Sequence, residues 1–278
     1  MKPRPRHDGA QGRRRKPPTK ERQRRVPRAD ASPHAERRAR QGEPRQKPTA
    51  RARRPPPKRP AAPQAPLDGP ELSREWVEEI RATARGEAQR AVDLVQRALA
   101  AYDDEDVDAA VAAAAEAKGI APRAARVREL LGLCLYRAGR WQEAVRELLA
   151  FRRMTGSVEE NHVIGDAYRA LGRPDRALEL ISEVPRRKVP ADLWAEVVIV
   201  AAGALADKGE LDQALLRLAR ADLEPRSVEP YHLRLWYVRS DLLERAGRHE
   251  EARAGWERIA AEDPDFHDVM ERLSPHST

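Results

Sequence analysis

The chain has 278 residues, of which 53 are Lys or Arg and 45 are Asp or Glu, giving a formal charge of +8. This charge is unevenly divided: residues 1–66 hold 22 basic and 5 acidic residues, whereas residues 67–278 hold 31 and 40. No apolar run approaches the roughly 18 residues of a membrane span. A single cysteine excludes an intrachain disulfide and a cysteine-based zinc site. The composition predicts a soluble, cytoplasmic protein with a basic segment and an acidic one.

Residues 1–66 are predicted to be a disordered, Arg- and Pro-rich tail. They contain 14 of the 23 prolines, and Met1 and Val26 are their only large apolar side chains. A segment with so little apolar surface cannot offset the entropy lost on ordering its backbone. Clusters of basic residues bind phosphate polyanions by releasing counterions. The candidate polyanion-binding residues are Arg13, Arg14, Arg15, Lys16, Arg24, Arg25, Arg37, Arg38, Arg53 and Arg54.

Three interpretations of this tail remain open. It could bind nucleic acid, most simply RNA or the ribosome, or it could be a solvating tail. It could also fold back onto the acidic remainder of the chain, since residues 67–278 carry a net charge of −9. Residues 1–66 contain no aromatic side chain on which a base could stack. Any binding to RNA is therefore expected to be independent of base sequence and sensitive to salt.

Residues 67–90 are predicted to be a linker followed by a leading helix. Ser73 is a suitable N-cap, because a serine hydroxyl can accept a hydrogen bond from a free N–H group of the first helical turn. Trp76, Val77 and Ile80 follow at spacings that place them on one side of a helix. This helix is expected to lead into the first of a series of repeats.

A motif about 34 residues long recurs through the rest of the chain. Its copies lie at 139–145, 172–178, 209–215 and 247–253, with a weaker copy at 105–111. In the stronger copies a glycine is predicted to end one helix in a left-handed turn, and an alanine five residues later lets the next helix cross closely. The shared alanines are Ala110, Ala144, Ala177, Ala214 and Ala252. The periodicity is helical throughout, so the repeats predict antiparallel helix pairs.

The repeats resemble the tetratricopeptide repeat (TPR) family, with Leu131, Gly132, Gly139 and Ala144 as the best-matched positions. The resemblance implies an all-α, right-handed α-solenoid of about five helix pairs. The copies are assigned to 91–124, 125–158, 158–191, 195–232 and 233–266, with a capping helix at 265–273. The repeat domain as a whole thus spans residues 91–273. The extra residues at 184–190 and 224–230 are expected to form loops between repeats.

The resemblance also implies a concave groove lined by the first helix of each pair. Its mixed charges suit a peptide or protein segment that carries both signs. A chaperone-type carboxylate clamp is not expected, because positions 129, 162, 199 and 237 hold no lysine and Asn161 is the single asparagine. The candidate groove residues are Arg126, Glu129, Tyr136, Arg137, His162, Asp166, Arg169, Arg234, Tyr237, Asp241 and Arg245.

No pattern in the sequence indicates catalysis, a metal or a cofactor. There is no phosphate-binding glycine loop, Gly-x-Ser-x-Gly elbow or His-Glu-x-x-His motif. Cys134 lies within Leu-Gly-Leu-Cys-Leu-Tyr, which favours a buried, inert thiol. The sequence therefore predicts a non-catalytic scaffold that binds a peptide or protein segment. The alternative is a nucleic-acid- or ribosome-associated factor that uses the basic tail.

Overall fold

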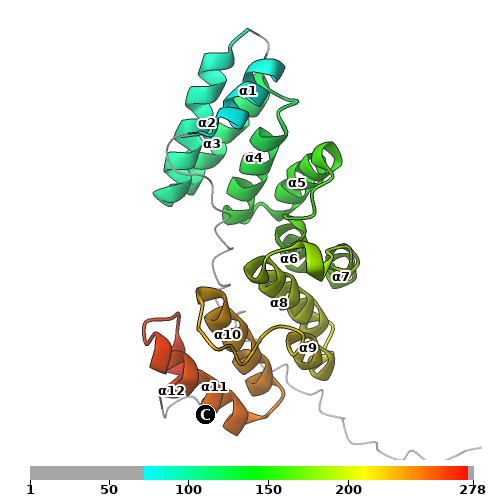
Figure 1. Ribbon diagram of the computed structural model, residues 1–278, viewed down its shortest axis with the longest axis vertical. Helices are drawn as coiled ribbons and strands as arrows, with labels where there is room; N and C mark the ends of the chain where they lie inside the picture. Colours follow the sequence, from blue (N-terminus) through cyan, green and yellow to red (C-terminus); the bar gives the residue numbers. More distant parts are fainter. Residues whose placement is uncertain (1–71, 85, 275–278) are drawn as a thin grey trace, which may run out of the picture. The chain divides into compact units, whose positions relative to one another are not determined.

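A computed structural model describes residues 72–84 and 86–274 (Figure 1). All regular structure in this part of the chain is helical, which confirms the predicted all-α class, and it lies within one compact unit, Pro56–Thr278. The tail predicted at 1–66 lies outside the described residues. The helices are α1 (Arg74–Thr83), α2 (Ala88–Asp103), α3 (Val107–Ile120), α4 (Ala125–Arg137), α5 (Trp141–Thr155), α6 (Asn161–Ala170), α7 (Pro174–Ser182), the 3-10 turn η1 (Arg186–Lys188), α8 (Ala191–Asp207), α9 (Leu211–Leu218), α10 (Pro230–Arg245), α11 (His249–Glu262) and α12 (Val269–Leu273).

The leading helix α1 begins as predicted. Ser73 is its N-cap and accepts a hydrogen bond from the backbone N–H of Trp76 at 3.5 Å. Ile80 is fully buried, and Trp76 and Val77 pack against the same apolar cluster. Helix α1 therefore packs on α2 through the apolar side that its spacing predicted.

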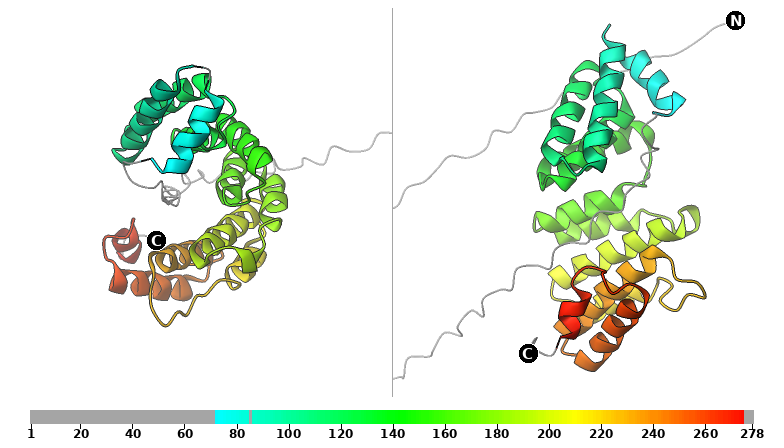
Figure 2. Two further views of the ribbon diagram at one scale, coloured as in Figure 1. Left: turned by 45° about the horizontal axis from the view of Figure 1, so that its top comes forward. Right: turned by 90° about the vertical axis from the view of Figure 1, so that its left-hand side faces the viewer.

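The helices pack as successive antiparallel pairs: α2 with α3, α4 with α5, α6 with α7, α8 with α9, and α10 with α11. Each first helix (α2, α4, α6, α8) contacts the first helix of the next pair, and each second helix (α3, α5, α7, α9) contacts that same helix. Figures 1 and 2 show one pair beside the next in chain order. This arrangement is the predicted solenoid of helix pairs.

The turns within the pairs follow from the recurring glycines. Gly139, Gly172, Gly209 and Gly247 have φ values of 70°, 71°, 85° and 77°, in the left-handed region that suits glycine. In each turn the following residue donates a backbone hydrogen bond to the carbonyl five residues earlier, as Arg140 does to Leu135 at 2.9 Å. The alanines five residues after these glycines are at most 2% exposed, which confirms the close helix crossing.

Helix α12 is shorter than the capping helix expected at 265–273. It spans Val269–Leu273, and Val269 is fully buried within an apolar cluster that also contains Trp256. The preceding residues do not continue α11, because Pro264 cannot donate a helical hydrogen bond and His267 has a φ of 52°. One helical turn, rather than two, therefore packs against the last pair.

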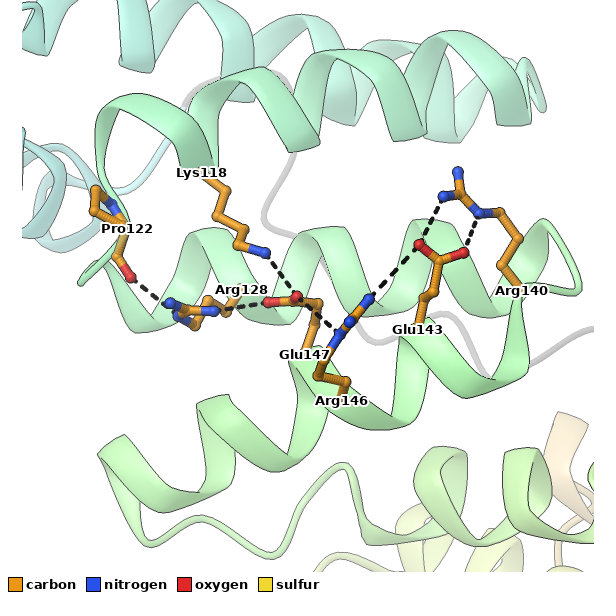
Figure 3. A network of polar contacts seen from close by, with 7 residues as sticks. All are labelled: Lys118, Pro122, Arg128, Arg140, Glu143, Arg146 and Glu147. Atoms are coloured by element: carbon orange, nitrogen blue, oxygen red, sulfur yellow. Dashed lines mark hydrogen bonds and ion pairs between the residues drawn. The ribbon is translucent and has the colours of Figure 1, made fainter.

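A buried carboxylate joins the first two helix pairs. Glu147 on α5 is 3% exposed. Its Oε1 accepts from Lys118 Nζ of α3 at 2.7 Å, and its Oε2 accepts from Arg128 Nη1 of α4 at 2.8 Å (Figure 3). Arg128 also donates from Nε to the carbonyl of Pro122 at 3.0 Å. Both carboxylate oxygens are thus satisfied, which offsets the cost of burying the charge.

Candidate functional site

The candidate groove residues lie on three of the first helices. We call the polar side chains of α4, α6, α8 and α10, together with the two residues directly before α6, the first-helix face. Helix α4 carries Arg126, Glu129, Tyr136 and Arg137; α6 carries His162, Asp166 and Arg169; and α10 carries Arg234, Tyr237, Asp241 and Arg245.

Helix α8 contributes to this face through residues that sequence reasoning missed. In the other well-matched copies a small residue stands seven positions before the turn glycine, as Gly165 does before Gly172. The same count back from Gly209 reaches Ala202 and makes Glu196 the equivalent of Arg126. This count could have identified Glu196 from the sequence, but the start of this copy was not defined well enough to apply it. Glu196 is 4% exposed, and Asp207 ends the same helix.

Many of the predicted groove residues are buried and paired within the chain. Glu129, His162, Asp166, Tyr136 and Tyr237 are each at most 9% exposed. The arginines among the candidates are more exposed: Arg126 and Arg245 are exposed, and Arg137, Arg169 and Arg234 are partly buried. The first-helix face therefore consists of buried polar side chains that already contact one another, with more exposed arginines around them.

A chain of hydrogen bonds crosses three first helices. The Tyr136 hydroxyl of α4 donates to Asp166 Oδ2 of α6 at 2.6 Å. Arg169 donates from Nη1 to Asp166 Oδ1 at 2.8 Å and from Nε to Asp207 Oδ2 of α8 at 2.8 Å. These contacts hold α4, α6 and α8 together at the carboxyl ends of α4 and α6.

Gly203 of α8 makes room for this contact chain. A Cβ atom built on Gly203 would lie only 2.2 Å from the guanidinium carbon of Arg169. The Arg169 side chain is 17% exposed, so it has little freedom to move aside. A side chain at position 203 would therefore displace the Arg169 guanidinium from its contacts with Asp166 and Asp207.

Two other arginines satisfy the carbonyl ends of neighbouring first helices. Arg137 Nη1 donates to the carbonyl of Tyr102 at 2.6 Å, near the end of α2, and its guanidinium carbon lies 3.6 Å from the centre of the Tyr102 ring. Arg245 Nη2 donates to the carbonyl of Ala206 at 3.3 Å, near the end of α8. Positive charge is stabilising at a helix C-terminus, so these arginines strengthen the stacking of first helices.

The α10 candidates form two further groups. Arg234 Nη2 donates to Glu196 Oε2 of α8 at 2.7 Å. Tyr237 donates to Asp268 Oδ1 at 2.6 Å. Arg272 of α12 donates to Asp268 at 3.0 Å and to Asp241 at 3.3 Å. Tyr237 and Asp241 therefore attach α12 to the last pair.

The amino-terminal end of α6 holds a concentration of carboxylates. Burial raises the pKa of Glu160, the N-cap residue of α6, to about 8, and the nearby Glu129 and Glu159 raise it further. Burial also raises the pKa of Glu129, although its hydrogen bond with Arg126 opposes this. On α8, burial raises the pKa of Glu196 to about 7 against the attraction of Arg234.

The chemistry of these groups does not point to catalysis. Burial lowers the pKa of His162 to about 4, and its Nδ1 lies 2.7 Å from the backbone oxygen of Glu159. Because that oxygen can only accept, Nδ1 carries the proton and the ring is neutral. Burial raises the pKa of the Cys134 thiol to about 12, which disfavours the reactive thiolate. The described residues contain no cluster of His, Cys, Asp and Glu suited to a metal ion.

The length and apolar character of a helix decide whether it can cross a membrane. Among the described residues, no helix has the length and apolar character needed to cross a membrane. The longest, α8, spans Ala191–Asp207.

Comparisons with known proteins agree with this architecture. Residues 85–154 match the family model of the tetratricopeptide repeat. A thermophilic TPR protein of Thermus thermophilus, TTC0263, is 19% identical, with a TM-score of 0.55 over 66% of this chain and 96% of that one. The TPR-like repeats of a Podosopora anserina putative kinesin light chain are 18% identical, with a TM-score of 0.52 over 66% of this chain and 97% of that one. The apo form of RapI is 12% identical, with a TM-score of 0.56 over 72% of this chain and 61% of that one.

At these identities the likeness to solved structures shows the fold alone. No curated protein matches the sequence.

Proposed function

Because residues 85–154 match the tetratricopeptide repeat and the described chain folds as a solenoid of helix pairs, we propose that the protein is a non-catalytic scaffold that binds a peptide or protein segment along its first-helix face. Repeat solenoids present extended surfaces that suit such binding. Fold alone does not choose a function, so the proposal depends on the chemistry of this face.

The observation that carries the proposal is where the buried polar side chains lie. Nine buried residues of the described part are polar or charged, and all except Glu147 lie on a first helix or directly before one. Burying polar groups adds little to stability compared with apolar packing. Their concentration on the first helices rather than the second therefore favours a role other than folding. The eight are Glu129, Glu160, Asn161, His162, Asp166, Glu196, His232 and Ser240.

The contacts between helices also favour binding at this face. The hydrogen bonds from Tyr136 through Asp166 and Arg169 to Asp207 fix the relative positions of α4, α6 and α8. A surface fixed before binding loses less conformational entropy when a ligand is bound. The face is therefore suited to holding an extended segment across several repeats.

Selection of a peptide library on the full-length chain tests this function. Glu159 is exposed beside α6, and Glu250 is exposed on the second helix α11. Glu159→Lys is expected to remove the selected peptides, because it reverses a charge on the first-helix face. Glu250→Lys makes the same charge change on another face and is expected to retain them. Retention by both variants would show that the peptides bind elsewhere.

The alternative function is binding of RNA or another polyanion by residues 1–66. The 22 basic and 5 acidic residues of this segment favour binding of a polyanion. Residues 67–278 have 31 basic and 40 acidic residues, and this excess of negative charge disfavours it. Replacing the arginines of the tail with glutamine should abolish RNA binding. Affinity of the unaltered chain should fall about a hundredfold or more between 50 and 200 mM salt. Unchanged RNA binding by the substituted chain would exclude this alternative.

A further inference from the structure

Three carboxylates meet one arginine where α4 passes the start of α6. Glu129 lies on α4, and Glu159 and Glu160 come directly before α6. Arg126 Nη1 donates to Glu129 Oε2 at 2.8 Å. Glu129, Glu159 and Arg126 all act electrostatically on Glu160, so the four groups are neighbours. Glu79 of α1 also acts electrostatically on Glu129 and Arg126, so acidic groups outnumber the basic group four to one.

Two adjacent buried residues at this place have acceptor atoms without a donor. Glu160 is 6% exposed, and its Oε2 receives no hydrogen bond. Asn161 is fully buried; its amide nitrogen donates to the carbonyl of Leu180 at 3.0 Å, but its Oδ1 receives no hydrogen bond. Buried polar atoms are normally hydrogen-bonded, so the unpaired carboxylate oxygen of Glu160 indicates a place for a donor.

The other buried carboxylates of the described residues do not share this property. Glu196 accepts from Arg234 at 2.7 Å, and Asp166 accepts from both Tyr136 and Arg169. Glu147 accepts from two cations, and Glu129 accepts from Arg126. Glu160 is thus the one buried carboxylate in this part of the chain to which no side chain donates. Among the buried carboxylates of the described residues, the absence of a donor is specific to the start of α6.

We propose that Glu160, together with Glu129, binds the guanidinium group of an arginine in a basic segment of a partner protein. This assignment rests on the proposed peptide-binding function and specifies the chemistry of the partner. A guanidinium group offers five N–H donors in a planar fork, which matches the two oxygens of a carboxylate. It also remains charged when desolvated, as a buried site requires.

Charge and access both favour a basic segment. Residues 67–278 carry a net charge of −9, so an approaching basic segment is attracted over a distance. The Arg126 side chain is 44% exposed and Glu159 is exposed, so two long side chains at the rim can rotate to admit a guanidinium group. A metal ion is not favoured, because the described residues contain no group suited to hold one.

Fluorescence anisotropy of the full-length chain with labelled peptides tests the proposal. The probe is a 12-residue peptide of alternating arginine and serine, and its control contains citrulline, the neutral isostere of arginine. At pH 9, above the pKa of about 8 to which burial raises Glu160, Glu160→Gln should weaken binding of the arginine peptide about tenfold, as expected for loss of one charge-assisted contact. Glu250→Gln removes the same charge from α11 and should change the Kd by less than about twofold. The citrulline peptide should bind weakly and equally to all three proteins.

Several outcomes would overturn the arginine site. Equal losses of affinity in Glu160→Gln and Glu250→Gln would show that the peptide is attracted by the overall charge of the chain and not by this site. If the arginine peptide bound only after the arginines of residues 1–66 were replaced by glutamine, the segment that occupies the site would be residues 1–66 of this chain. Equal, tight binding of the arginine and citrulline peptides to the first-helix face would reject the site but keep the proposed function. If neither these peptides nor a library bound to that face, both proposals would fail.

Discussion

Replacing Glu160 with glutamine is expected to change how stability depends on pH. Burial raises the pKa of Glu160 to about 8 in the folded chain, against an ordinary value of 4.5. The surrounding charges are Glu129 and Arg126 of α4 and Glu159 beside it. A raised carboxyl pKa means that folding favours the protonated form. Its contribution to stability is therefore fully present below pH 4.5 and is lost as the pH rises through 8.

The magnitude follows from the separation of the two pKa values. At about 1.4 kcal/mol per pH unit, titration of Glu160 should lower the free energy of unfolding by about 4 kcal/mol between about pH 5 and pH 8.5. Glutamine cannot ionise, so Glu160→Gln should lose less stability over this range. The variant should be the more stable protein at the alkaline end, and the difference should be small at the acidic end.

Urea denaturation followed by circular dichroism measures this difference, because urea leaves the ionic strength unchanged. Glu250→Gln is the matched control, since Glu250 is exposed on α11. Its unfolding curve should follow that of the unaltered chain at each pH. A constant difference between Glu160→Gln and the unaltered chain across this pH range would refute the reasoning, because it would show that Glu160 does not titrate there.

Three further substitutions, two of them with a control variant, test the local geometry. Glu105 has a φ of 60° where the better copies have glycine, so Glu105→Gly should raise the free energy of unfolding by about 0.5–1 kcal/mol, measured by urea denaturation. Gly203→Ala should lower the free energy of unfolding by about 1–3 kcal/mol, because the new Cβ would meet the guanidinium group of Arg169. Gly119→Ala is the control: the space around its Cβ is open, so the free energy of unfolding should stay the same or rise. Glu147→Ala should lower the midpoint of thermal unfolding by several degrees, because it removes the carboxylate that pairs with Lys118 and Arg128. Glu143→Ala, at a more exposed position, should shift the midpoint little. Equal shifts for the last two variants would contradict the assigned role of Glu147.

The local features of the fold could be predicted because they depend on residues close together in sequence. The turn glycines, the alanine five residues later and the N-cap at Ser73 each act within one or two helical turns. The copy at 91–124 departs from the glycine pattern at Glu105, yet that residue adopts the same left-handed conformation. The repeated geometry is therefore maintained even where the residue type is unfavourable.

The contacts of the first-helix face could not be predicted in the same way. Those between different helices join residues 30 or more positions apart, such as Tyr136 with Asp166 and Arg169 with Asp207. Helical periodicity places these residues on a face but does not identify their partners. Glu196 was missed because the surrounding residues of α8 are almost all apolar, which obscures the copy's register. Glu160 stands five residues before Gly165, where other copies have the buried apolar residues Val127 and Val197, so the count of groove positions did not include it.

Hydrogen–deuterium exchange of the full-length chain, with and without a peptide selected from a library, tests the central claim most directly. Binding along the first-helix face predicts slower exchange in α4, α6 and α8, with little change in the second helices α5, α7 and α9. Slower exchange confined to those second helices, or none in the first helices, would contradict the assignment of this face as the binding surface.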